Sequence, residues 1–174
     1  MAGRPLTGLL LALTLLTSEA QGSGQSAPET REMLQVGSGA LSWWGIPLYE
    51  ATLLAPLGEF QAEGPYALQL TYRRNFSRSQ LARATLDEIE RMRGTRGDRE
   101  RLISRFEALF ADVTPGDQLL GVHLPGEAAV FYGPDGYLGR LDDPELASAF
   151  FEIWLAPGNR NCANACWGLR SDQA

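Results

Sequence analysis

The stretch SWWGIPLYEATLLAP, residues 42–56, carries apolar side chains on both faces of the strand that it predicts. Successive side chains of an extended chain point to opposite faces, so a half-exposed strand should alternate apolar and polar residues. One face here carries Trp43, Pro47, Tyr49, Ala51 and Leu53. The other face carries Trp44, Ile46, Leu48 and Leu54. The pattern therefore predicts that protein or a bound molecule covers the second face as well as the first.

Strands are predicted on both sides of this stretch. Extended segments are expected over Met33–Val36 and Ala40–Ala55, joined by three small residues, Gly-Ser-Gly. Pro47 cannot donate to a sheet, so a kink, a bulge or a sheet edge is expected there. The segment YALQLTYRRN alternates with period two, which is typical of a half-buried strand. One face of that strand carries Tyr66, Leu68, Leu70, Tyr72 and Arg74.

Two helices are predicted next. Ser77 can cap a helix that runs to about Met92, because serine accepts hydrogen bonds from the first helical N–H groups. A polar break over residues 94–98 leads into a second helix, whose apolar residues recur at three- and four-residue spacing and should face a core. These residues are Leu102, Ile103, Phe106, Leu109, Phe110 and Val113.

The last third of the chain predicts a meander followed by a helix. Three short extended runs cover Leu119–Leu124, Ala128–Tyr132 and Tyr137–Leu141, and LPGE between the first two suits a type II turn. Asp142 or Asp143 can cap a helix that begins at Pro144. The order of strands, two helices, strands and a helix predicts an α+β fold, an antiparallel sheet with helices gathered on one face.

The first twenty residues have the layout of a secretory signal peptide. Arg4 is followed by the uncharged apolar run Leu6–Leu16 and by the small-residue cleavage site Ser18-Glu19-Ala20. The apolar run is short for a membrane span, so an uncleaved anchor is the less favoured alternative. We therefore predict a signal peptide over residues 1–20, a disordered leader over 21–32 and one domain over 33–170. The mature protein should be periplasmic or secreted, with no integral membrane segment.

Charge and composition exclude several kinds of chemistry. The net charge is −6, and the arginines between residues 91 and 105 interleave with acidic residues. That pattern indicates a salt-bridged helix surface rather than a nucleic-acid interface. All 15 basic residues are arginine, so Schiff-base chemistry at lysine is excluded.

Cys162 and Cys166 are the only cysteines, and His123 is the only histidine. In an oxidising compartment a local disulfide between the two cysteines is favoured, with free thiols as the alternative. A zinc site would need more ligands than this region offers. His123 stands in an apolar run, which favours a packed or surface histidine over a catalytic one. We predict no catalytic residues, no metal and no cofactor, and leave the oligomeric state open.

Several motifs together resemble one protein family from about Leu34 to Leu155. They are VGSGALSWWGIPLYEATL, then ALQLTYRRNFS, then FADVTPGDQLLGVHLPGEAAVFYGPDGYLGRLDDPELASAFFEIWL. In this order they resemble the chalcone isomerase-like family, specifically its secreted bacterial branch. The resemblance implies an open-faced β-sandwich, an antiparallel sheet backed by a helical layer. Members of the family include isomerases that close a flavonoid ring, fatty-acid-binding relatives and many proteins of undefined role.

The residues that the resemblance would make functional are mostly replaced. The family's glycine-rich turn is usually followed by arginine, whereas Gly39 is followed by Ala40-Leu41-Ser42. Trp44 stands where the enzymes carry a threonine, and the lysine of the plant enzymes has no counterpart. Arg74 does match a recurrent family position. Its alternative interpretation is a surface charge paired with a nearby glutamate.

We therefore predict a non-catalytic protein that binds a small apolar or amphipathic molecule, such as a fatty acid, in a cleft on the side of the sheet away from the helices. Trp44, Tyr49 and Tyr72 would line this cleft, and Arg74 would meet an acidic head group. One alternative is an isomerase, an intramolecular lyase of the chalcone isomerase type, with Arg73 or Arg74 replacing the missing arginine. A second alternative is a structural or partner-binding envelope protein.

Overall fold

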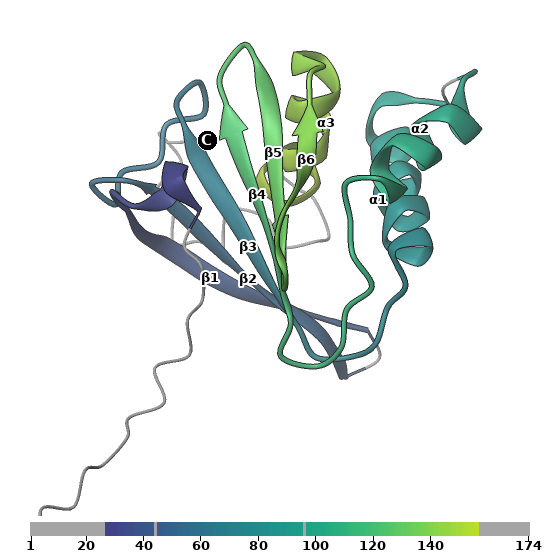
Figure 1. The fold of residues 1–174 in the computed structure, drawn as a ribbon, viewed down its shortest axis with the longest axis horizontal. Coiled ribbons are helices and arrows are strands. Elements are labelled where there is room, and N and C mark those ends of the chain that lie inside the picture. The colour runs from purple at the N-terminus through teal and green to yellow at the C-terminus, as the bar shows by residue number, and fades with distance from the viewer. Residues whose placement is uncertain (1–26, 44, 96, 157–174) are drawn as a thin grey trace, which may run out of the picture.

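The computed structural model describes residues 27–43, 45–95 and 97–156, and its centre is a six-stranded antiparallel sheet. The strands lie side by side in chain order, β1 to β6 (Figure 1). They are β1 (Met33–Trp43), β2 (Ile46–Pro56), β3 (Tyr66–Tyr72), β4 (Gln118–Leu124), β5 (Ala128–Gly133) and β6 (Gly136–Leu141). The predicted meander of three short strands is confirmed, and Gly126 in its first turn has the positive φ of 70° that a type II turn requires.

Helices α1 and α3 begin at the predicted caps. Helices α1 (Arg78–Arg93) and α2 (Arg99–Glu107) lie between β3 and β4 in the chain, and α3 (Pro144–Leu155) follows β6. Ser77 forms a reciprocal capping box with Gln80 at the start of α1. Asp143 accepts a 3.0 Å hydrogen bond from the N–H of Leu146 at the start of α3. The helices cover one face of the sheet, so the predicted α+β, open-faced arrangement is confirmed (Figure 1).

The long strand predicted over Ala40–Ala55 is wrong, because the chain reverses after Trp43. Strands β1 and β2 form a hairpin in which Trp43 pairs with Ile46, and Gly45 in the turn has a φ of 76°. Glycine adopts this left-handed conformation without the steric cost of a Cβ atom. The expected irregularity at Pro47 is confirmed: Leu41 pairs with Tyr49 and the next residue with Pro47, so β2 bulges there.

The second helix ends earlier than its apolar stripe predicts. Helix α2 stops at Glu107, yet Leu109, Phe110 and Val113 remain buried in the segment that follows. Val113 forms a two-hydrogen-bond bridge with Phe76, at 2.9 and 3.0 Å. This bridge satisfies the backbone hydrogen bonds of Val113 without a helix. The apolar spacing therefore predicts the burial of these residues correctly, but it does not predict their backbone conformation.

Aromatic rings fill the core between the sheet and the helices. The rings of Phe106, Phe110, Phe131, Phe150 and Phe151 pack against one another in stacked and edge-to-face contacts. Helix α3 approaches β4 closely at Gly121, where a Cβ atom would lie 3.3 Å from the rings of both Phe150 and Phe151. The absence of a side chain at Gly121 therefore lets the largest rings of α3 reach the sheet.

His123 is packed inside this core, which is one of the two roles, packed or surface, that the sequence favours. Its ring stacks on Tyr66 at a centroid distance of 4.5 Å and meets the edge of Phe151. The Nδ1 atom lies 3.1 Å from the carbonyl oxygen of Gly64. Burial lowers the pKa of His123, against the opposing effects of that carbonyl and of Glu63.

Ion pairs join the helices at their surfaces. Arg93 of α1 donates to both carboxylate oxygens of Glu152 in α3, at 3.0 and 2.5 Å. Arg105 of α2 donates to Asp143 at the start of α3, at 3.0 Å. The interleaved charges therefore form the salt-bridged surface that their spacing predicts. None of the helices over the described ranges is long and apolar enough to cross a membrane.

The face of the sheet away from the helices is crossed by the N-terminal strap, which we define as residues 27–32. A short 3₁₀ turn, Pro28–Thr30, lies in this strap, and Glu29 accepts a 2.7 Å hydrogen bond from the hydroxyl of Tyr132 on β5. Ala27 is only 2% exposed, and beneath this face Ala67 and Val122 are fully buried. The N-terminal strap therefore covers part of the second face, although its residues lie within the predicted disordered leader.

Candidate functional site

Tyr49 and Tyr72 lie together on the face of the sheet that the helices cover. The two rings meet edge to face at a centroid distance of 5.9 Å, and Tyr72 also contacts Phe76 at 5.7 Å. The Nε1 atom of Trp154 donates a 3.0 Å hydrogen bond to the hydroxyl oxygen of Tyr49. The two tyrosines therefore belong to the sheet–helix core, and the expectation that they line a hollow on the opposite side is wrong.

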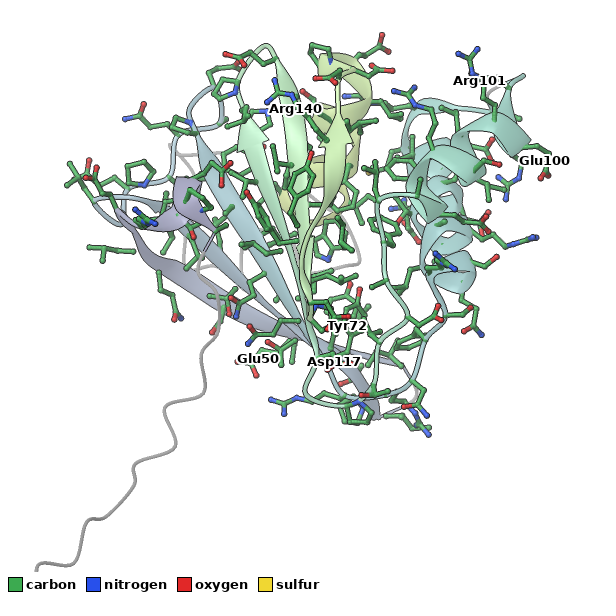
Figure 2. The ribbon with its side chains drawn as sticks, in the orientation of Figure 1. Glu50, Tyr72, Glu100, Arg101, Asp117 and Arg140 are labelled. Carbon is green, nitrogen blue, oxygen red and sulfur yellow. The ribbon has the colours of Figure 1, made fainter. Side chains whose placement is uncertain are left out.

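The sheet register brings the two tyrosines together. Tyr49 of β2 and Tyr72 of β3 are direct cross-strand partners, and such partners share a face. The backbone of Tyr72 is fixed by two hydrogen bonds, to the carbonyl of Asp117 at 2.9 Å and from the N–H of Gly116 at 2.8 Å. Figure 2 shows Tyr72 and Asp117 near each other at one end of the sheet. Alternation along the sequence predicts which residues of one strand share a face. It does not predict which residues of the neighbouring strand lie on that same face.

The hydroxyl group of Tyr72 is buried without a hydrogen-bond partner among the described residues. Its side chain is 4% exposed, and its contacts are with aromatic rings. Burial raises the pKa of Tyr72 well above 10, and the neighbouring Tyr49 raises it further. The phenol is therefore neutral, with an O–H available to donate. An unpaired buried hydroxyl costs about 1–3 kcal/mol, and most such groups in proteins have a partner.

The two arginines after β3 differ in their surroundings. Arg73 donates a 2.9 Å hydrogen bond to Glu50 across the sheet. Arg74 is exposed, two residues beyond the end of β3, and forms no ion pair within the part of the chain that the structure describes. The glutamate pairing considered for Arg74 is thus made by Arg73. Arg74 stays available to an anion at the surface but lies outside the buried tyrosine cluster.

Other predicted site residues fall outside the described ranges. Trp44, which was expected to line the cleft, is one of them, and so are Cys162 and Cys166 with their expected disulfide. Across residues 27–43, 45–95 and 97–156, no group of three or more histidine, cysteine or acidic residues could hold a metal ion.

Phe76 and Trp154 complete the cluster, although no sequence pattern marks either of them as a site residue. We therefore define the tyrosine cluster as Tyr49, Tyr72, Phe76 and Trp154, contributed by two strands, the segment before α1, and α3. Trp154 stands in the apolar stripe of FFEIWL, where nothing distinguishes it from an ordinary core residue. Its indole N–H is the only hint, because a buried tryptophan N–H usually finds an acceptor.

A family model described as chalcone isomerase-like matches residues 44–161. The chain belongs to the chalcone isomerase-like family. The match contains the complete tyrosine cluster and five of the six strands, and it leaves out the N-terminal strap and all of β1.

One relative of this chalcone isomerase-like protein is an uncharacterized protein of Haemophilus influenzae, 28% identical over 125 residues. The alignment covers 71% of this chain and 61% of the relative. A similar solved structure is the crystal structure of a fatty-acid binding protein of Arabidopsis thaliana, with a TM-score of 0.57 and 12% sequence identity. It covers 76% of this chain and 89% of the plant protein, and at this identity the likeness shows a shared fold.

Proposed function

We propose that this chalcone isomerase-like protein is a non-catalytic binder of a small amphipathic molecule, such as a fatty acid. The observation that carries the proposal is the buried, unpaired hydroxyl of Tyr72 in an otherwise aromatic setting. A ligand whose polar end accepts a hydrogen bond from Tyr72 would remove the cost of that unpaired group. The fatty-acid binding protein that shares the fold supports this choice of ligand class.

The surroundings of Tyr72 favour a ligand that is mostly apolar. Tyr49, Phe76 and Trp154 offer ring surface, and burial of apolar surface stabilises a complex by about 25 cal/mol per Å². One or two placed polar groups are enough to orient such a ligand. Tyr72 supplies a donor in the interior, and the exposed Arg74 could attract an acidic ligand at the surface.

Two features support binding without catalysis. The positions where the enzymes of the family carry arginine, threonine and lysine do not carry them here, and Arg73 is already paired with Glu50. A group aimed at developing charge typically contributes about 10²–10³-fold in rate. We therefore expect no ring closure when a chalcone is added. Ring closure that Arg74→Ala abolishes would favour the isomerase alternative.

Export forms part of the same proposal. Residues 1–20 have the layout of a signal peptide, so the mature protein would act in the periplasm or outside the cell. The mass of the protein purified from the producing cell tests this step. A mature chain that begins near Gln21 supports export, and an intact N-terminus contradicts it.

Binding of a fluorescent fatty acid tests the ligand site directly. We expect Tyr72→Phe to weaken binding about fivefold to tenfold, since the lost hydrogen bond contributes about 1–1.5 kcal/mol. Tyr137→Phe is the matched control, because Tyr137 is 64% exposed on β6. Equal affinity of the wild-type protein and Tyr72→Phe would remove Tyr72 from the site, and no binding to the wild-type protein would overturn the proposed function.

A further inference from the structure

The turn that follows β2 holds a leucine in a strained and exposed position. Leu57 has a φ of +57°, the only positive φ at a non-glycine residue within the described ranges. Its side chain is 82% exposed. Two hydrogen bonds close the turn around it, from Gly58 N–H to Ala55 and from Glu59 N–H to Pro56, both at 3.1 Å. Glycine or asparagine would fit this backbone with less strain than leucine does.

A second exposed leucine lies beside this turn. Leu34, near the start of β1, is 59% exposed, and its Cβ atom lies next to Gly58. The pairing of Met33 with Pro56 holds the start of β1 against the end of β2. We call Leu34 and Leu57 the leucine tip. Strain at a functional position persists when the surrounding structure enforces it, so a strained leucine that shows its side chain to solvent indicates a role for that side chain.

We propose that the leucine tip docks this protein onto a lipid surface. The charges next to it in the chain, Arg31, Glu32 and Glu59, have mixed signs and match no strongly charged partner. Aliphatic side chains at a turn suit shallow insertion among acyl chains, which depends on apolar area. The choice of lipid over a protein partner rests on the proposed function, since a membrane is a source of fatty acids.

Two leucines give weak and reversible docking. Even one myristoyl chain binds membranes only marginally, and two partly exposed leucines offer less apolar area than that chain. We therefore expect brief contact rather than stable anchoring. Such contact fits a protein that collects or delivers an amphipathic molecule and then leaves.

Co-sedimentation with phosphatidylcholine vesicles tests the proposal. The chain from Gln21 onward is the right material, because it keeps every described residue and lacks the apolar run Leu6–Leu16, which would itself bind lipid. We expect Leu57→Asn to lower the vesicle partition coefficient about tenfold. The same substitution should leave the midpoint of thermal unfolding unchanged or higher, since asparagine tolerates a positive φ.

Control variants distinguish vesicle binding through the leucine tip from non-specific hydrophobic adsorption and from binding at the ligand site. Tyr137→Ser removes another exposed ring, on β6, and should leave vesicle binding unchanged. Tyr72→Phe should weaken ligand binding but not vesicle binding, so a failure of the proposed function stays distinguishable from a failure of docking. Wild-type protein that stays in the supernatant would overturn the proposal. So would equal binding by Leu57→Asn, or binding that requires anionic lipid and disappears in high salt.

Discussion

Two buried polar rings on neighbouring strands show how differently single residues are accommodated in this core. His123 has a backbone carbonyl within hydrogen-bond distance and an aromatic ring on each side. Tyr72 has aromatic neighbours too, but its hydroxyl has no partner in the described structure. The first residue is typical of a packed core. The second retains a hydrogen-bonding group that packing alone does not need.

Tyr72→Phe should therefore raise the stability of the ligand-free protein while it lowers the affinity for the ligand. In protein stripped of ligand, we expect the substitution to raise the free energy of unfolding by about 1 kcal/mol, because it removes an unpaired buried hydroxyl. Urea denaturation of delipidated wild-type and variant protein measures this. A loss of 1 kcal/mol or more would mean that the hydroxyl is already satisfied, by a bound water for example.

His123 should titrate below the usual histidine range near 6.5, because burial lowers its pKa. The folded pKa then lies below the unfolded one, so the unfolded chain binds more protons between the two values. The contribution of His123 to the free energy of unfolding is therefore fully present above about pH 6.5, and it decreases as the pH drops through this window. His123 is the only histidine, so one Cε1–H resonance reports the titration by NMR. A value above 6.5 would contradict the burial argument.

At the scale of elements, sequence signals with a local cause were the most reliable. The caps at Ser77 and Asp143 and the turn at Gly126 follow from hydrogen bonding and backbone sterics within a few residues, and all three are confirmed. The strand over Ala40–Ala55 was wrong because one glycine, Gly45, turned a continuous apolar run into a hairpin. After α2 ends at Glu107, Val113 pairs with the distant Phe76, and no local pattern contains that partner.

The N-terminal strap shows the same limit. Its composition predicts a disordered leader, yet Glu29 in the strap accepts a hydrogen bond from Tyr132, 103 residues away in the chain. Burial, aided by the hydrogen bond and charge of Glu29, raises the pKa of Tyr132 to about 12. The hydrogen bond is therefore present throughout the neutral pH range.

Loss of that hydrogen bond should loosen the strap. We expect Tyr132→Phe to speed trypsin cleavage after Arg31 about fivefold, which corresponds to about 1 kcal/mol for the lost bond. Tyr137→Phe is the control, since its ring contacts Tyr132 but no described contact joins it to Glu29. Cleavage at the wild-type rate in Tyr132→Phe would show that the hydrogen bond does not hold the strap.

For the whole molecule, the sequence predicted the fold better than the site. The order and periodicity of the elements were enough to predict an antiparallel sheet with helices on one face. They could not say which face receives Tyr49 and Tyr72, since alternation separates two faces without identifying the covered one. The structure places both tyrosines toward the helices, and it keeps Arg74 exposed at the surface. Binding is therefore proposed between the layers, where the unpaired hydroxyl lies.

Native mass spectrometry of the protein purified without detergent tests the central claim most directly. We predict a population heavier than the mature chain by the mass of one small amphipathic molecule, which organic extraction releases as a fatty acid or a close relative. Tyr72→Phe should lose most of this population, and Tyr137→Phe should keep it. Wild-type protein that carries no such molecule, and gains none when incubated with fatty acids, would contradict the account.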